Sequence, residues 1–229
     1  MARAAQRAGV TIIVATPHVS RRYANDGQTI RERVQTMRRA LREADIELDV
    51  RSGAKIAFAR LADLSDDELS ALRLGDGPWL LVESPLAWVV NDFESVLDEV
   101  HRRGHWILLA HPERSPLFLR NRPRLHALVS SGMLCSVTAS SLLGAFGRDV
   151  QHFALGLIRD GLVANLASNA HDSVRRPPTA LGDVFATIAD MPEAKAQFEW
   201  MTSDLPRAIL EGDVLPKPPA GASWPATSI

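Results

Sequence analysis

Short apolar runs that end in polar residues recur along the chain, and a stretch with helical periodicity follows each of them. Six runs have this form, at residues 11–15, 48–52, 79–83, 106–110, 134–138 and 162–167. Several are continuously apolar, as expected for strands that are covered on both faces. The alternation predicts an α/β fold with a parallel sheet or barrel and right-handed crossovers.

Capping residues mark the helices between these runs. Ser65 with Glu68 has the spacing of a capping box, and Asn91 with Glu94 precedes an apolar stripe at positions 93, 96, 97 and 100. Glycines fall just before four of the strands, where a helix C-cap needs a residue that tolerates positive φ, at positions 9, 104, 132 and 161.

Composition narrows the class of protein. With 46% hydrophobic and 23% charged residues among 229, and a formal charge of −1, the chain is typical of a globular protein without a basic field for nucleic acid. No window approaches about 18 consecutive apolar residues, so we expect no membrane insertion. The single cysteine, Cys135, cannot form an internal disulfide, which favours a reducing, cytoplasmic location.

Residues 213–229 are rich in Pro and Gly and are predicted to form a flexible tail.

Polar side chains with ligand chemistry follow four of the predicted strands. They include His18, Glu83, His111 and the pair Asn169 and His171. In α/β folds of this kind, the groups at the carboxyl ends of strands meet at one mouth. Three imidazoles, one carboxylate and one amide oxygen suit Mn, Zn or Fe, and such ions polarise phosphoryl oxygens and supply hydroxide. The pattern favours a metal-dependent phosphoesterase.

Three further residues lie near these strand ends. Arg114 and Arg176 could each hold a phosphate through the guanidinium fork, although either could also be a surface cation. Tyr23, in the loop after His18, could stack on a substrate or be a structural loop residue.

Fragments along most of the chain match one family in the family's order. They are ATPH (15–18), RSGAKI (51–56), LVESP (81–85), AHPER (110–114), SSLLGAFG (140–147), ASNAHD (167–172), RRPP (175–178) and LPRAILEG (205–212). With them the chain resembles the polymerase and histidinol phosphatase (PHP) superfamily. More narrowly, it resembles the bacterial manganese-dependent protein-tyrosine phosphatases of capsule and exopolysaccharide biosynthesis.

The resemblance implies a distorted (β/α)7, TIM-like barrel over residues 1–212, with a cluster of metal ions at its mouth. Position by position, it implies that His18, Glu83, His111 and His171 are metal ligands, that Asn169 stands where the family has a ligand Asp, and that Arg114 and Arg176 are the catalytic arginines that hold phosphate. It also implies Mn²⁺, or another divalent metal such as Fe or Zn, as cofactor. The implied partner is the phosphotyrosine tail of a bacterial tyrosine kinase, and oligomers are compatible with it.

Three departures from the family pattern change the expectation. Lys55 stands where the family has a metal-bridging Glu, Asn169 replaces a carboxylate, and the family's first strand with its D-x-H-x-H motif is missing, which predicts a start codon placed too late. Swapping Glu for Lys moves the local charge by two units, so we expect weak metal binding, with Lys55 binding phosphate directly. Two alternatives to an active tyrosine phosphatase stay open. One is a catalytically silent relative that binds phosphate or a kinase as a regulatory module, and the other is a hydrolase of histidinol phosphate or another phosphomonoester.

Overall fold

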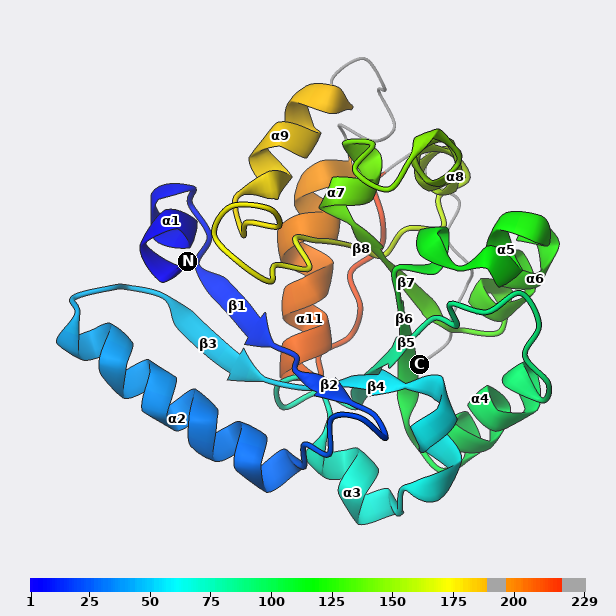
Figure 1. Cartoon of the computed structure of the whole chain (residues 1–229), viewed down its shortest axis with the longest axis horizontal. Coiled ribbons are helices and arrows are strands. Elements are labelled where there is room, and N and C mark those ends of the chain that lie inside the picture. Colours follow the sequence, from blue (N-terminus) through cyan, green and yellow to red (C-terminus); the bar gives the residue numbers. More distant parts are fainter. Residues whose placement is uncertain (189–196, 220–229) are drawn as a thin grey trace.

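Parallel strands form the centre of the molecule (Figure 1). The computed structural model describes residues 1–188 and 197–219. Its strands are β1 (Ile12–Ala15), β2 (His18–Val19), β3 (Asp49–Ser52), β4 (Lys55–Ala57), β5 (Trp79–Glu83), β6 (Trp106–Ala110), β7 (Leu134–Thr138) and β8 (Asn165–Ala167). β1 pairs with β3, and a six-stranded sheet has the order β2-β4-β5-β6-β7-β8, with every pair parallel. The α/β fold with parallel strands is therefore confirmed.

The two sheets continue one another along the chain. β1 leads through Thr16 and Pro17 into β2, while β3 leads through Gly53 and Ala54 into β4, and the same two segments pair on both sides of the break. All six predicted runs contain a strand, but β2 and β4 were not predicted. Proline and glycine interrupt the apolar pattern there, and the pieces beyond them are too short to show a period of their own.

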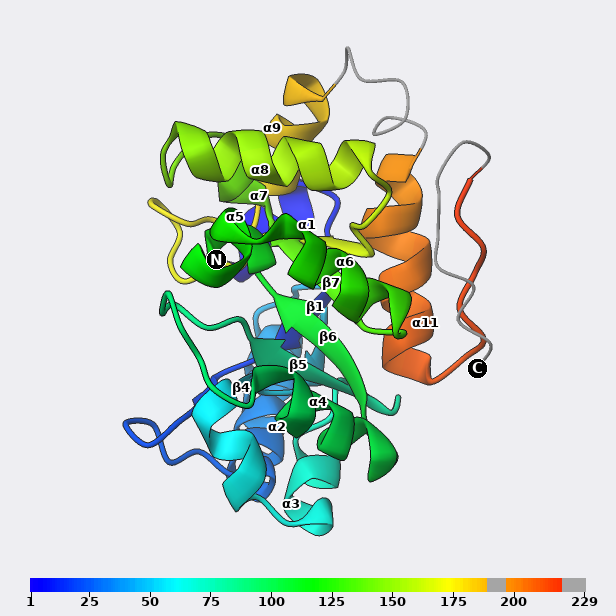
Figure 2. The same ribbon diagram turned by 90° about the vertical axis from the view of Figure 1, so that its right-hand side faces the viewer.

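Helices lie around the outside of the sheet (Figures 1 and 2). They are α1 (Ala2–Arg7), α2 (Gly27–Glu43), α3 (Asp66–Ala71), α4 (Phe93–Arg102), α5 (Pro116–Arg120), α6 (Arg122–Ser130), α7 (Ala139–Leu142), α8 (Arg148–Arg159), α9 (Ala180–Thr187) and α11 (Leu205–Glu211). Shorter turns are η1 (Phe58–Asp63), η2 (Pro112–Arg114) and η3 (Trp200–Asp204). No helix of the described residues is long and apolar enough to cross a membrane.

One of the two predicted helix starts is right and the other is wrong by a residue. The Ser65–Glu68 capping box forms at the start of α3. At α4 the cap is Asp92 rather than Asn91, and its φ of 56° places it in the left-handed region. The Glu94 carboxylate is engaged elsewhere, by the Arg124 guanidinium, so it cannot complete a capping box. The predicted apolar stripe of α4 is buried at Phe93, Leu97 and Val100.

Cys135 and residues near the C-terminal end of the described chain belong to the core or pack against it. Cys135 is fully buried on β7, and burial raises the pKa of its thiol. Leu215 packs against the core, and the Trp200 indole donates to the carbonyl of Pro216 at 3.0 Å. Of the predicted tail, residues 220–229 lie outside the described part of the chain, and its flexibility stays a prediction.

Candidate active site

Strand register brings the predicted site residues to one edge of the sheet. His18 is level with Lys55 across the β2–β4 pair, and Ala57 is level with Glu83 across the β4–β5 pair. Glu83 is in turn level with Ala110, the residue before His111. Side chains two apart on a strand share a face, so Lys55 lies on the same face as Glu83.

The carboxylate of Glu83 is the common neighbour of this group. One of its oxygens lies 3.6 Å from Nδ1 of His18, and the other lies 3.5 Å from Nε2 of His111. Lys55 Nζ stands 4.0 Å from the second oxygen. Burial raises the pKa of Glu83, but the adjacent His111 and the Lys55 charge outweigh it and hold the pKa below its usual value. Glu83 is therefore a carboxylate near neutral pH.

Lys55 is a buried cation at the centre of the site. Its side chain is 6% exposed, and Nζ donates to Oδ1 of Asn169 at 3.4 Å in addition to its contact with Glu83. Burial lowers the pKa of this ammonium, whereas the Glu83 charge opposes the shift. Asn169 reaches Lys55 from the loop after β8, a separation of 114 residues along the chain.

Unusual backbone geometry places two of the site residues. His111 (φ 41°) and Asn169 (φ 46°) are among the four non-glycine residues with positive φ in the described residues. Such conformations are costly outside glycine and are concentrated at functional sites. The loop after β8 is held by its own bonds, since Nδ1 of His171 lies 2.7 Å from the Asn169 carbonyl and the His171 amide donates to the Arg176 carbonyl at 3.0 Å.

The three imidazoles of the site are held in the neutral form. Burial is the largest cause that lowers the pKa values of His18, His111 and His171, and the nearby charge of Lys55 lowers each of them further. The positive charge of the mouth therefore comes from Lys55 and arginines rather than from histidines. Within the described residues, Nδ1 of His111 is buried without a hydrogen-bond partner.

Both predicted arginines lie close enough to this group for their charges to act on it. The charges of Arg114 and Arg176 act on Lys55, and each also acts on His171. Arg114 is half-buried, and its guanidinium lies 4.0 Å from the centre of the Phe146 ring, which supports it from one side. The sequence reading did not identify Phe146 as a site residue. The charges of both arginines thus add to that of Lys55 in a site where Glu83 is the neighbouring carboxylate, an arrangement that attracts an anion.

Tyr23 lies at the rim of the site rather than inside it. Its side chain is 47% exposed, and its ring centre is 5.9 Å from that of His18. A substrate ring that enters beside His18 would meet Tyr23, so a stacking role remains a prediction.

The donor types at this mouth suit a divalent metal, but their present positions do not fit one. Imidazole nitrogens with carboxylate and amide oxygens are ligands of Mn, Fe and Zn. Within the described ranges, however, no group of three or more His, Cys, Asp or Glu side chains could hold a metal ion. The obstacle is the Lys55 ammonium, which lies against the Glu83 and Asn169 oxygens. A cluster of several ions does not fit a site with one carboxylate and this buried cation.

A second carboxyl group, Glu113, fixes the turn that carries His111 and Arg114. Glu113 is fully buried and accepts hydrogen bonds from the Thr138 amide at 3.1 Å and from the Ser141 hydroxyl at 2.6 Å. On the other side, the Ser115 hydroxyl donates to the Pro85 carbonyl at 2.5 Å. The sequence reading missed both residues. Glu113 is an ionisable residue in a short segment between a strand and a helix, and this is the signal that could have indicated it.

Replacing Glu113 with Gln is expected to change how stability depends on pH. Burial raises the pKa of Glu113 from 4.5 to about 7, so the folded state favours the protonated acid. Its stabilising contribution is therefore complete below the unfolded pKa and is lost as pH rises through the folded pKa. Relative to Glu113→Gln, the wild-type free energy of unfolding should fall by about 3 kcal/mol across that interval. Urea unfolding of both proteins at several pH values measures this difference. Parallel stability curves would contradict a buried, titrating Glu113.

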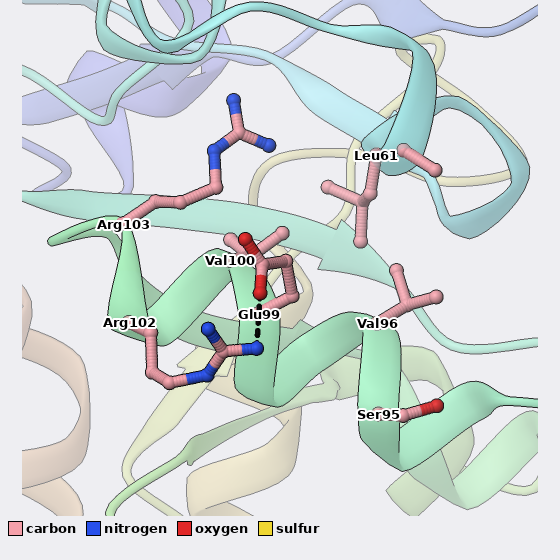
Figure 3. A pocket seen from close by; sticks show the side chains of 8 residues that line it. Leu61, Ser95, Val96, Glu99, Val100, Arg102 and Arg103 are labelled. Atoms are coloured by element: carbon pink, nitrogen blue, oxygen red, sulfur yellow. Dashed lines mark ion pairs between the residues drawn. The ribbon is translucent and has the colours of Figure 1, made fainter.

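Two hollows lie outside the cluster around Glu83. The larger, of about 630 Å³, opens beside Val19, between the loop after β2 and helix α3. The smaller, of about 210 Å³, lies between η1 and α4 (Figure 3), where Leu61 faces Val96 and the Glu99–Arg102 ion pair lies at one side. Neither hollow is lined by a predicted site residue.

Comparisons with known proteins agree on one relationship. A family model described as capsular polysaccharide synthesis, CpsB/CapC, matches residues 1–210. Tyrosine-protein phosphatase YwqE of Bacillus subtilis is 32% identical over 173 residues, which cover 75% of this chain and 68% of the relative. A putative tyrosine-protein phosphatase, CapC of Staphylococcus aureus, is 30% identical over 176 residues, which cover 76% and 68%.

A solved structure is similar over almost the whole fold. It comes from crystallographic work on YwqE from Bacillus subtilis and CpsB from Streptococcus pneumoniae, described as metal-dependent tyrosine phosphatases. The similarity has a TM-score of 0.80 at 27% sequence identity and covers 95% of this chain and 89% of the other.

Proposed function

Because this chain belongs to the CpsB/CapC family of capsular polysaccharide synthesis, we propose that it is a protein-tyrosine phosphatase, a hydrolase that releases phosphate from phosphotyrosine in a protein partner. The observation that carries the proposal is the convergence of Lys55, Arg114 and Arg176 on a mouth with one carboxylate and three neutral imidazoles. A phosphate ester is the anion that this charge and hydrogen-bonding capacity suit best.

Each cation has a distinct task in the proposed reaction. Arg114 and Arg176 hold the phosphoryl oxygens through their guanidinium groups, and the cradle around Arg114 is rigid because Phe146 and the Glu113 turn support it. Lys55 lies deepest and places a positive charge next to Glu83. These charges stabilise the phosphoryl group as negative charge develops on its oxygens. The tyrosine ring then lies toward the rim, where Tyr23 is exposed.

A divalent metal such as Mn²⁺ is consistent with this family, since the structural neighbours are described as metal-dependent. We propose as its ligands the residues that the resemblance implies, namely His18, Glu83, His111, Asn169 and His171. The amide oxygen of Asn169 is the weakest donor among them. The Lys55 ammonium lies against the Glu83 and Asn169 oxygens that such an ion would need.

Three finer features complete the proposal. From β4 to β8 each parallel strand is the neighbour of the next along the chain, which supports a distorted (β/α)7 barrel of the PHP type. The partner is proposed to be the phosphotyrosine tail of a bacterial tyrosine kinase in capsule or exopolysaccharide synthesis, and the family description supports the link to capsular polysaccharide. A cytoplasmic location stays a prediction from the single cysteine.

A second candidate function is a catalytically silent module that binds phosphotyrosine without hydrolysing it. The contact of Lys55 with Glu83 and Asn169 favours this candidate. A metal ion would need the oxygens of these two residues, and the Lys55 ammonium lies against them. Binding of phosphate requires only the three cations, whereas turnover also requires an activated water.

Phosphate release by the purified protein with added Mn²⁺ tests these candidates. We expect turnover of a phosphotyrosyl peptide that exceeds turnover of histidinol phosphate. Tight binding of the peptide with no release of phosphate would establish the silent module instead. Failure to bind phosphotyrosine at all would contradict both candidates, and preference for histidinol phosphate would move the protein to the phosphomonoesterase alternative.

A further inference from the structure

Phe146 is the side chain that contacts the Arg114 guanidinium in the described part of the chain. The guanidinium lies 4.0 Å from the centre of the Phe146 ring. Within residues 1–188 and 197–219, no hydrogen bond or ion pair engages the donors of this side chain. The N–H donors of a half-buried arginine are therefore free of protein partners, while an aromatic ring lies against the group that carries them.

Arg122 shows the more usual way of holding an arginine. Its guanidinium lies 5.7 Å from the centre of the Phe153 ring, but it also forms an ion pair with the Asp160 carboxylate. The carboxylate orients Arg122 and uses its donors. At Arg114 the orienting group is the Phe146 ring, which uses none of them.

The loop between α7 and α8 holds Phe146 in place by its own bonds. Gly144 (φ 80°) and Gly147 (φ 93°) turn the chain on either side of it. The Gly147 amide donates to the Gly144 carbonyl at 3.1 Å, and the side-chain amide of Gln151 donates to the Leu142 carbonyl at 2.8 Å. Gln151 belongs to α8, so the start of that helix closes the loop.

The same segment also binds the turn that carries Arg114. The Ser141 hydroxyl, on α7, donates to the Glu113 carboxyl group at 2.6 Å. Helices α7 and α8 lie next to each other (Figure 2), and α8 also packs against η2. One segment therefore fixes the backbone of η2 through Glu113 and the end of the Arg114 side chain through Phe146.

An aromatic ring suits this position because of the charges around Arg114. Burial lowers the pKa of the Arg114 guanidinium, and the charge of Arg176 also lowers it, although nearby carboxylates oppose the shift. The negative face of a ring stabilises a cation without adding a formal charge. A carboxylate in the place of Phe146 would compete with phosphate for the same donors, whereas the ring leaves them available.

We infer that Phe146 is a positioning residue for phosphate binding, which acts by holding the Arg114 guanidinium in the orientation that an anion requires. This inference rests on the proposed function and names a residue outside the cluster around Glu83 on which that function depends. Ordering a long side chain during binding costs affinity, so an arginine that is already ordered binds its ligand more tightly. An aliphatic side chain of similar size would fill the space beside Arg114 without attracting its charge.

Binding of a labelled phosphonate probe, measured by fluorescence anisotropy, tests the inference. The probe is a short peptide with a non-hydrolysable phosphonate in place of tyrosine phosphate. We expect Phe146→Leu to bind it about five- to tenfold more weakly than the wild type, which corresponds to the cost of ordering one long side chain. Phe146→Tyr keeps the aromatic face and should retain the wild-type affinity.

Two further variants sharpen this measurement. Phe153→Leu is the matched control, because it removes the ring beside Arg122 and should bind the probe like the wild type. Gln151→Ala removes the bond that closes the loop and leaves the Phe146 ring itself unchanged. It should weaken probe binding in the same direction as Phe146→Leu but by less.

A double-variant cycle shows whether Phe146 acts through Arg114. In the Arg114→Ala background the guanidinium is gone, so Phe146→Leu should cause no further loss of affinity. A loss of the same size in both backgrounds would overturn the inference. So would a Phe146→Leu protein that is less stable to urea but binds the probe with wild-type affinity, because the ring would then be only structural. Both results leave the proposed function standing, whereas a wild-type protein that does not bind the probe would overturn the proposed function together with the inference.

Discussion

The double variant Lys55→Glu, Asn169→Asp is expected to bind Mn²⁺ at least about a hundredfold more tightly than the wild type. The wild-type ammonium lies 3.4 Å from the Asn169 oxygen and 4.0 Å from a Glu83 oxygen. Replacing it with a carboxylate changes the local charge by two units, and Asn169→Asp adds one more. A unit charge about 4 Å from another contributes about 4 kcal/mol at an intermediate effective dielectric, so a hundredfold gain in affinity needs only part of that change.

Metal binding itself is the measurement, by isothermal titration with Mn²⁺ and by the metal content of the purified protein. The variant gains two carboxylates beside Glu83 and loses the ammonium of Lys55, so it should also be less stable without metal and recover thermal stability when Mn²⁺ is added. Lys55→Gln separates the two effects of Lys55, because it removes the cation without adding a carboxylate. It should bind Mn²⁺ more tightly than the wild type and less tightly than the double variant.

The same variant separates the two candidate functions. A gain in manganese affinity together with a gain in phosphate release would show that Lys55 and Asn169 limit catalysis in the wild type. A gain in manganese affinity without a gain in phosphate release would show that other features of the site limit catalysis. No gain in manganese affinity would contradict the view that Lys55 competes with a metal for these oxygens.

The ends of the strands were the most predictable part of this protein. Apolar runs of five or six residues followed by polar ones located the strands, and in a parallel sheet the carboxyl ends meet at one edge. That rule was enough to place His18, Glu83 and His111 together, and the structure does bring them together around Glu83. Their roles as metal ligands stay a prediction. The family assignment, which rested on ordered fragments rather than on any single residue, is confirmed.

Contacts between distant segments were beyond the sequence pattern. The sequence pattern did not indicate that Lys55 is almost wholly buried. Its strand, β4, has only three residues and follows soon after Gly53, so it shows no periodic pattern of its own. Glu113 was equally hidden, since its partners Thr138 and Ser141 belong to the next strand and helix. The start of α4 was misplaced because Glu94 pairs with Arg124, 30 residues away, instead of its own helix cap. In each case a tertiary partner decided the outcome.

Truncating either Arg114 or Arg176 to Ala is expected to weaken phosphate binding and slow phosphotyrosine hydrolysis by about a hundredfold, the effect of removing one oxyanion-stabilising group. Arg114 is half-buried over Phe146, and the Arg176 backbone carbonyl already holds the His171 amide, so a change in its side chain leaves that bond in place. If Arg176→Ala weakens phosphate binding, the cause is therefore the loss of the guanidinium rather than a change in the loop.

Isothermal titration with inorganic phosphate gives the direct measurement, because it needs neither turnover nor metal. Arg114→Lys and Arg176→Lys should recover only part of the affinity, since an ammonium keeps the charge but not the planar fork of donors. Arg33→Gln on the exposed face of α2 removes one positive charge far from the mouth and should change nothing. If both alanine variants bound phosphate as the wild type does, the anion would have to be held elsewhere, and the proposed phosphatase pocket would be wrong. Because the two guanidiniums act on one anion, the double variant should lose less than the product of the two single losses.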